Sequence, residues 1–272
     1  MFLDRHVFAL AVLCYGVSML YSVFLWRKGF QRDNWVNFGI LVGGFLLNGV
    51  ALFSRGIHWD RCPVNNLYEA MVFLEWTISG TAVVMGLTPK LRFVGAFASP
   101  VLFCLGVFAL MPSLDVKHGA SPDFSNGPTS LHAASIILAY GAFGIASISG
   151  AMFLTQDRDL KHNKLRAMLS ILPPLGKLER VTAQLMWAGF VLLTIGLVVG
   201  AIWVPLPAGK SFFSDLKVIW SLALWGVYLV LLVLHLRSSL RGRRFAWGAV
   251  ASFAIILLTF WGSNLGSSIH QP

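Results

Sequence analysis

Eight apolar segments constrain this chain more than any other feature of its sequence. They occupy residues 7–26, 35–54, 66–87, 93–111, 130–153, 183–206, 216–236 and 245–263. Each is close to the roughly 20 residues that an α-helix needs to cross about 30 Å of hydrocarbon. No soluble domain fits between them. The sequence therefore predicts an all-α fold: a polytopic integral membrane helical bundle of about eight transmembrane helices, forming one domain over residues 1–272.

The composition agrees with a membrane protein and argues against other classes. Hydrophobic residues make up 57% of the chain and charged residues only 12%, whereas about a quarter of a soluble domain is charged. The cysteines Cys14, Cys62 and Cys104 are too few and too scattered for a disulfide framework. No small-residue cleavage site precedes Trp26, so we expect the first segment to be a retained span and not a signal peptide.

The basic residues predict the orientation of the bundle. With the N-terminus outside, 15 of the 21 lysine and arginine residues fall in the inner loops, as the positive-inside rule requires. An even number of spans then brings the C-terminus back to the outer, periplasmic side. The same distribution accounts for the net charge of +10 without a nucleic-acid partner. The inner basic residues are Arg27, Lys28, Arg32, Lys90, Arg92, Arg158, Lys161, Lys164, Arg166, Lys177, Arg180, Arg237, Arg241, Arg243 and Arg244.

The longest inner loop, from Gln156 to Val181, carries the amphipathic piece KLRAMLSILPPLGKLERV. We expect this piece to lie along the cytoplasmic interface with its basic residues toward lipid headgroups. Docking of a cytoplasmic partner is the alternative. Because the chain is short and has no transit-like extension, we expect it in a bacterial inner (cytoplasmic) membrane.

Two carboxyl groups enter the third segment from its outer end. Glu69 lies about one turn deep, where it either caps the helix start or lies on a functional pathway. Glu75 lies deeper, where no cap is available, and a carboxyl group in hydrocarbon is expected to be neutral or paired.

Histidines near helix ends are the candidate ligands. His132 opens the fifth segment, His235 lies near the end of the seventh, and His270 follows the eighth. His132 and His270 share the outer side, so they could hold one iron axially, although many interfacial histidines are merely solvated. His58 and Cys62 make only two ligands, which is a weak metal site.

The outer segment before the seventh span combines aromatic and charged residues. Phe212, Phe213 and Trp220 are either interfacial anchors or a surface on which a flat apolar ligand stacks. Asp215 stands where an N-cap is expected.

Four stretches together resemble the cytochrome c assembly family, the CcsA/ResC type of haem-handling membrane protein. The resemblance covers residues 55–272. The stretches are CPVNNLYEAMVFLEW (62–76), LHAASIILAYGAF (131–143), DLKVIWSLALWGVYLVLLVLHLR (215–237) and FWGSNLGSSIHQ (260–271).

The resemblance implies specific roles. His132 and His270 would hold the iron of a non-covalently bound haem b at the outer face, for delivery to apocytochrome c. His235 would be the intramembrane histidine of haem transit, and Asp215 with its neighbours Phe212, Phe213 and Trp220 would form the haem-facing motif. The implied partners are a membrane subunit of the ResB/CcsB type and the apocytochrome. No CxxCH motif occurs, so covalent haem attachment to this chain is not expected.

The haem-facing motif departs from the tryptophan-rich family pattern. Phe212 and Ser214 stand where tryptophans are expected, and Leu216 replaces a proline. Such departures are also found in the HemX-like and YpjD-like branches. The alternative function is therefore a HemX-like regulatory or scaffold protein without haem ligation. Whether the chain takes part in a cytochrome c haem-lyase or synthase complex as an enzyme stays open. A small-solute transporter is the third reading, disfavoured because no inverted repeat is evident.

Overall fold

The computed structural model describes residues 2–27, 34–60, 62–64, 66–115, 127–161, 172–203 and 215–265. Within these ranges the chain forms eight α-helices, two short 3₁₀ helices and no strand. The α-helices are α1 (Phe2–Arg27), α2 (Trp35–Trp59), α3 (Leu67–Gly86), α4 (Val94–Ala109), α5 (Gly127–Lys161), α7 (Leu175–Trp203), α8 (Leu216–Leu236) and α9 (Arg243–Leu265). The 3₁₀ helices are η1 (Pro89–Leu91) and η2 (Pro112–Asp115).

These helices confirm the predicted all-α bundle, one helix for each apolar segment. Five of them (α1, α2, α5, α7 and α8) are long and apolar enough to cross a membrane. α4 is shorter, with 16 residues. The protein is therefore a multi-pass membrane protein.

The predicted inner loop from Gln156 to Val181 is wrong at both ends. α5 continues to Lys161, where an ion pair 2.9 Å long joins Lys161 to Asp157 one turn earlier. α7 already begins at Leu175, and Leu178 is fully buried. The described part of the amphipathic piece is thus the start of a packed helix. The rest of the piece, residues 164–171, lies outside the described residues, so its placement along the cytoplasmic interface stays a prediction.

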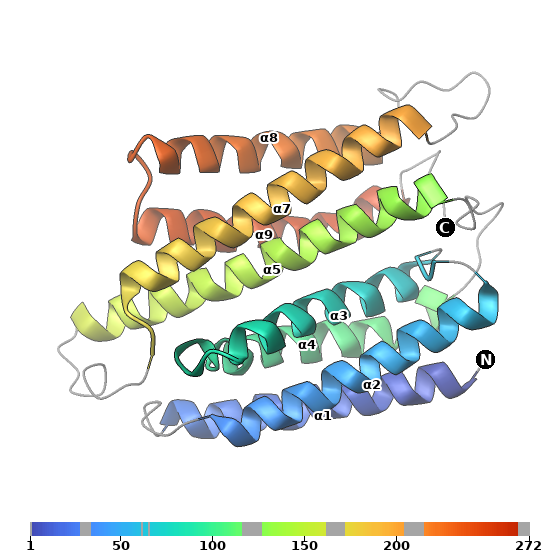
Figure 1. Cartoon of the computed structure of the whole chain (residues 1–272), viewed down its shortest axis with the longest axis horizontal. Coiled ribbons are helices and arrows are strands. Elements are labelled where there is room, and N and C mark those ends of the chain that lie inside the picture. Colours follow the sequence, from blue (N-terminus) through green and yellow to red (C-terminus); the bar gives the residue numbers. More distant parts are fainter. Residues whose placement is uncertain are drawn as a thin grey trace.

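The helices run antiparallel in two groups, α1–α4 and α5 with α7–α9 (Figure 1). α5 packs mainly on α7 and α9 and also contacts α3 and α4 of the other group. In its most apolar stretch 83% of α5 is buried, against 44% or less for the other four spanning helices. α5 is therefore the central element. We call the end of the bundle where α5 begins the His132 end, and the opposite end the His235 end.

Close backbone approach holds α5 to its neighbours. A Cβ atom at Gly141 would lie 2.0 Å from Thr77 Oγ1 on α3, and one at Gly189 of α7 would lie 2.6 Å from the Phe143 ring. In hydrocarbon, small residues of this kind let helices gain van der Waals contact.

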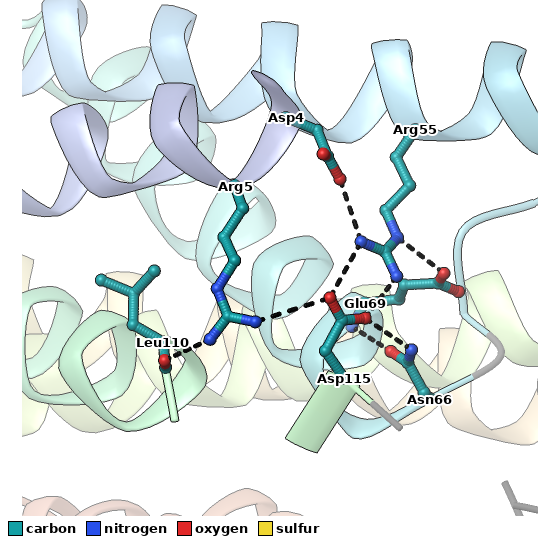
Figure 2. A network of polar contacts seen from close by, with 7 residues as sticks. All are labelled: Asp4, Arg5, Arg55, Asn66, Glu69, Leu110 and Asp115. Atoms are coloured by element: carbon teal, nitrogen blue, oxygen red, sulfur yellow. Dashed lines mark hydrogen bonds and ion pairs between the residues drawn. The ribbon is translucent and has the colours of Figure 1, made fainter. Parts of the chain in front are cut away.

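At the His132 end a buried ion cluster joins α1, α2, α3 and η2 (Figure 2). Arg55, at the end of α2, is only 6% exposed and contacts three carboxylates: Asp4 on α1 at 2.9 Å, Glu69 on α3 at 2.8 Å, and Asp115 on η2. Arg5 also lies 3.7 Å from Asp115. The cluster thus fixes α1, α2, α3 and η2 to one another.

The ion cluster and the start of α3 give the surroundings of Glu69. The side chain of Asn66 caps α3 by accepting a hydrogen bond of 2.8 Å from the Glu69 amide. Glu69 lies in the first turn of α3, where a carboxylate is favoured by the helix dipole, and its carboxylate binds Arg55. Glu75 is fully buried, and its two carboxyl oxygens have no hydrogen-bond partner among the described residues.

The contact of Gly141 with Thr77 gives a first prediction. Gly141→Ala should lower the free energy of unfolding by about 1–3 kcal/mol, because the new methyl group overlaps Thr77 and α3 must shift. Unfolding of the detergent-solubilised protein by heat or denaturant measures the change. Gly226→Ala on α8 is the control, since its Cβ would meet nothing within 4 Å. Equal stability of the two variants would contradict the prediction.

The ion cluster gives a second prediction. Arg55→Gln should cost about 3–5 kcal/mol, because it leaves three carboxylates at a mostly buried position without their shared cation. Lys161→Gln breaks an exposed pair and should change stability by less than about 1 kcal/mol. If both variants unfolded at the same denaturant concentration, the cluster would not be the stabilising element inferred here.

Candidate functional site

His132 lies in the second turn of α5, half-buried against α7. Its Nδ1 is 2.7 Å from the carbonyl oxygen of Gly196. A carbonyl only accepts hydrogen bonds, so Nδ1 carries the proton that is donated. In the neutral ring the lone pair is then on Nε2, which is the nitrogen a metal ion would bind. Donation of the other ring nitrogen to a carbonyl is the usual way in which a ligating histidine is oriented.

Two glycines of α7 make the room for this imidazole. A Cβ atom at Gly200 would come within 2.5 Å of both Nδ1 and Cε1 of His132, and one at Gly196 would meet the His132 backbone oxygen at 3.4 Å. The ring therefore occupies the space that side chains would take on an ordinary helix. Its position is set by the α5–α7 contact, and not by a loop.

The start of α8 lies near His132. Asp215 is buried and caps α8, as expected, by accepting hydrogen bonds from the amides of Lys217 at 2.9 Å and Val218 at 3.3 Å. The positive charge of Lys217 is close enough to act on His132. Trp220 is half-buried and packs on the core.

The Tyr140 side chain lies close to Ser221, which adds a second link from α5 to the start of α8. The fold thus brings together two of the stretches on which the family resemblance rests, residues 131–143 and 215–237. Phe212 and Phe213 lie outside the described residues, so their stacking role stays a prediction.

His235 lies at the opposite end of the bundle, in the last turn of α8 (Figure 1). Its Nδ1 is 3.1 Å from the carbonyl oxygen of Leu240 and 3.8 Å from Glu179 Oε1. The ring stacks on Phe245 with centroids 4.0 Å apart. His235 is therefore oriented in the same manner as His132, by a carbonyl at Nδ1, but it belongs to a different site.

The pairing of His132 with His270 stays a prediction, because His270 lies outside the described residues. α9 ends at Leu265, at the end of the bundle where α5 begins (Figure 1). His58 is exposed on the last turn of α2. In the described part of the chain no three His, Cys, Asp or Glu side chains form a cluster that could hold a metal ion.

Sequence reasoning missed the ion cluster, which lies at the His132 end (Figure 2). From the sequence Glu69 is expected as a cap or on a functional pathway, and no partner is predicted for Arg55. A basic residue at the end of one apolar segment and an acidic residue at the start of the next could have indicated the ion pair between Arg55 and Glu69. Their partners Asp4 and Asp115 are 51 and 60 residues from Arg55, and nothing in the local pattern connects them.

Comparison with known proteins gives consistent matches. Residues 64–270 match the family model described as "Cytochrome C assembly protein". The chain is 24% identical over 268 residues to Protein HemX of Brevibacillus brevis, covering 98% of both chains. It is 27% identical to the cytochrome c biogenesis protein CcsA of Trieres chinensis, covering 96% of this chain and 92% of that one. With CcsA of Gloeobacter violaceus it shares 25% identity over 81% of each chain.

The family model spans α3 to α9, so it includes His132, His235 and the start of α8. The predicted resemblance is thereby confirmed. This chain belongs to the cytochrome c assembly protein family.

Proposed function

We propose that this protein takes part in cytochrome c maturation by holding haem at the outer membrane face, between His132 and His270, for delivery to apocytochrome c. The observation that carries the proposal is the orientation of His132. Its Nδ1–H group donates a hydrogen bond to the carbonyl oxygen of Gly196, so the lone pair that can bind a metal ion is on Nε2. The match to curated CcsA proteins supports the biological context.

The residues around His132 fit haem. An oriented imidazole is a common axial ligand of haem iron. Lys217 brings a positive charge near the same ring, which suits a haem propionate. Bound haem would supply the vinyl groups that react with the CxxCH cysteines of the apocytochrome. The contribution of this chain is to fix the position of the ring and so lower the entropic cost of that reaction.

His235 fits a separate, earlier position of haem in the membrane. It lies 19 residues after Leu216 on α8, which is about 29 Å along a helix. No single iron can contact two histidines so far apart. The proposal is therefore sequential, with His235 on the transit path and His132 at the point of delivery. A ResB/CcsB-type subunit is the proposed membrane partner, and a bacterial inner membrane with the His132 end outside is the proposed location.

A HemX-like regulatory or scaffold role is the second candidate. It is favoured by the similarity to HemX along 98% of both chains, and by Ser214 and Leu216 in the haem-facing motif. A deletion strain separates the two functions. Loss of c-type cytochromes supports haem delivery, whereas normal c-type cytochromes with altered haem synthesis support regulation.

The third prediction concerns the haem ligands. Absorption spectra of the purified protein should show a Soret band that weakens or shifts in the His132→Ala/His270→Ala double variant, because the axial ligands are lost. His235→Ala should retain the spectrum of haem bound at the outer pair. An unchanged band in the double variant would assign the ligand elsewhere. No band even after addition of haem would exclude haem binding and leave the regulatory role.

The fourth prediction concerns Gly200→Ala, which adds one methyl group next to the His132 ring. Gly200→Ala would bring a Cβ atom 2.5 Å from His132 Nδ1, so the imidazole must move and lose its bond to Gly196. Loss of such a supporting contact typically weakens metal binding by roughly 10–100-fold. Haem titration followed at the Soret band measures the affinity. Gly226→Ala, which adds the same methyl group in open space, should bind haem normally. Wild-type affinity in Gly200→Ala would contradict the assigned role of the α5–α7 contact.

A further inference from the structure

A groove separate from both histidines lies between α5 and α9 at the His235 end. Its volume is about 540 Å³. It is lined by the last three turns of α5 and the first two turns of α9. The lining residues are Ala151, Leu154, Thr155, Asp157, Arg158, Lys161, Arg243, Trp247 and Val250.

The charges in this groove gather at one end. Arg158 and Lys161 come from the end of α5, and Arg243 is the first residue of α9. Asp157 is the one acidic lining residue, and it pairs with Lys161 at 2.9 Å. An anion in the groove would therefore bind mainly to Arg158 of α5 and Arg243 of α9, because Lys161 is already paired.

The remaining lining is mostly apolar and extends away from the charges. On α9 the groove runs from Arg243 to Val250, which is about 10 Å along the helix. On α5 it includes Leu154 and Ala151, and the Trp247 side chain is 54% exposed beside it. Tryptophan is typical of the level where headgroups meet hydrocarbon. The groove thus has a cationic end at the membrane surface and an apolar continuation toward the membrane interior.

We propose that this groove is a binding site for an anionic phospholipid. The headgroup phosphate would bind Arg158 and Arg243, and an acyl chain would lie along Leu154, Trp247 and Val250. Arginine suits this role because its planar guanidinium can donate two parallel hydrogen bonds to two oxygens of one phosphate. Basic pockets between transmembrane helices are known to bind anionic headgroups in this manner. A free phosphate ion would use only the charged end and leave the apolar part unoccupied.

The site would strengthen the α5–α9 contact from outside. The two helices already meet closely one turn deeper, where a Cβ at Gly150 would lie 3.0 Å from the Ala246 backbone oxygen. A lipid bound across Arg158 and Arg243 would link the helix ends next to this contact. This inference is independent of haem binding, so it can fail while the proposed function holds.

Native mass spectrometry of the delipidated protein in neutral detergent tests the proposal, with phosphatidylglycerol as the probe. Arg158→Gln/Arg243→Gln should reduce lipid retention by roughly tenfold or more, because each basic residue near the membrane surface contributes on the order of 1 kcal/mol. Arg237→Gln/Arg241→Gln is the matched control. It removes the same charge from the same end of the bundle, at exposed arginines that do not line the groove.

Each outcome decides the proposal. Selective loss in the groove variant, with retained helicity by circular dichroism, supports it. Equal loss of lipid in both variants would mean that the lipid is held by surface charge in general and not by the groove. Unchanged lipid retention in the groove variant would refute the site. Inorganic phosphate that displaces the lipid at comparable concentration would show a simple anion site. Displacement by added haem would assign the groove to haem, and either result overturns a lipid site.

Discussion

The close approach of α5 to its neighbours is the contact on which the rest of this structure depends. α5 joins the two groups of helices and is the most buried of the spanning helices. It meets α3 where Gly141 packs against Thr77, and it meets α7 where Gly189 packs against the Phe143 ring. Helices in hydrocarbon gain no hydrophobic driving force from one another, so the stability of such contacts comes from dense packing. His132 lies further along the contact of α5 with α7, against Gly196 and Gly200, and its orientation is therefore a consequence of helix packing.

The charged groups of the described helices gather at the two ends of the bundle. The His132 end carries the ion cluster around Arg55 and the start of α8, and the His235 end carries a histidine held by Leu240 and the basic groove between α5 and α9. Charged and polar groups are costly in hydrocarbon, so they gather where partners or water are available. Glu75 is the exception, since it is buried between these ends without a described partner.

The sequence predicted local features well and long-range ones poorly. Helix bounds follow from apolar segment length, and the N-cap at Asp215 follows from residue type at a helix start. The loop from Gln156 to Val181 was predicted too long, because charged residues such as Asp157 and Lys161 are also good solvated helix ends. The ion pair of Glu69 with Arg55 could not be predicted, because Arg55 belongs to another helix and the neighbours of a helix cannot be deduced from apolar segments alone.

By itself, the sequence determined that this protein is a helical membrane bundle of the cytochrome c assembly type, because span length and residue motifs are properties of contiguous stretches. Only the tertiary structure decided that Gly196 orients His132, that Leu240 orients His235, and that three carboxylates share Arg55. These facts depend on which helix faces which and on where small residues let backbones meet. Such choices are set by packing over the whole bundle, and no single segment contains them.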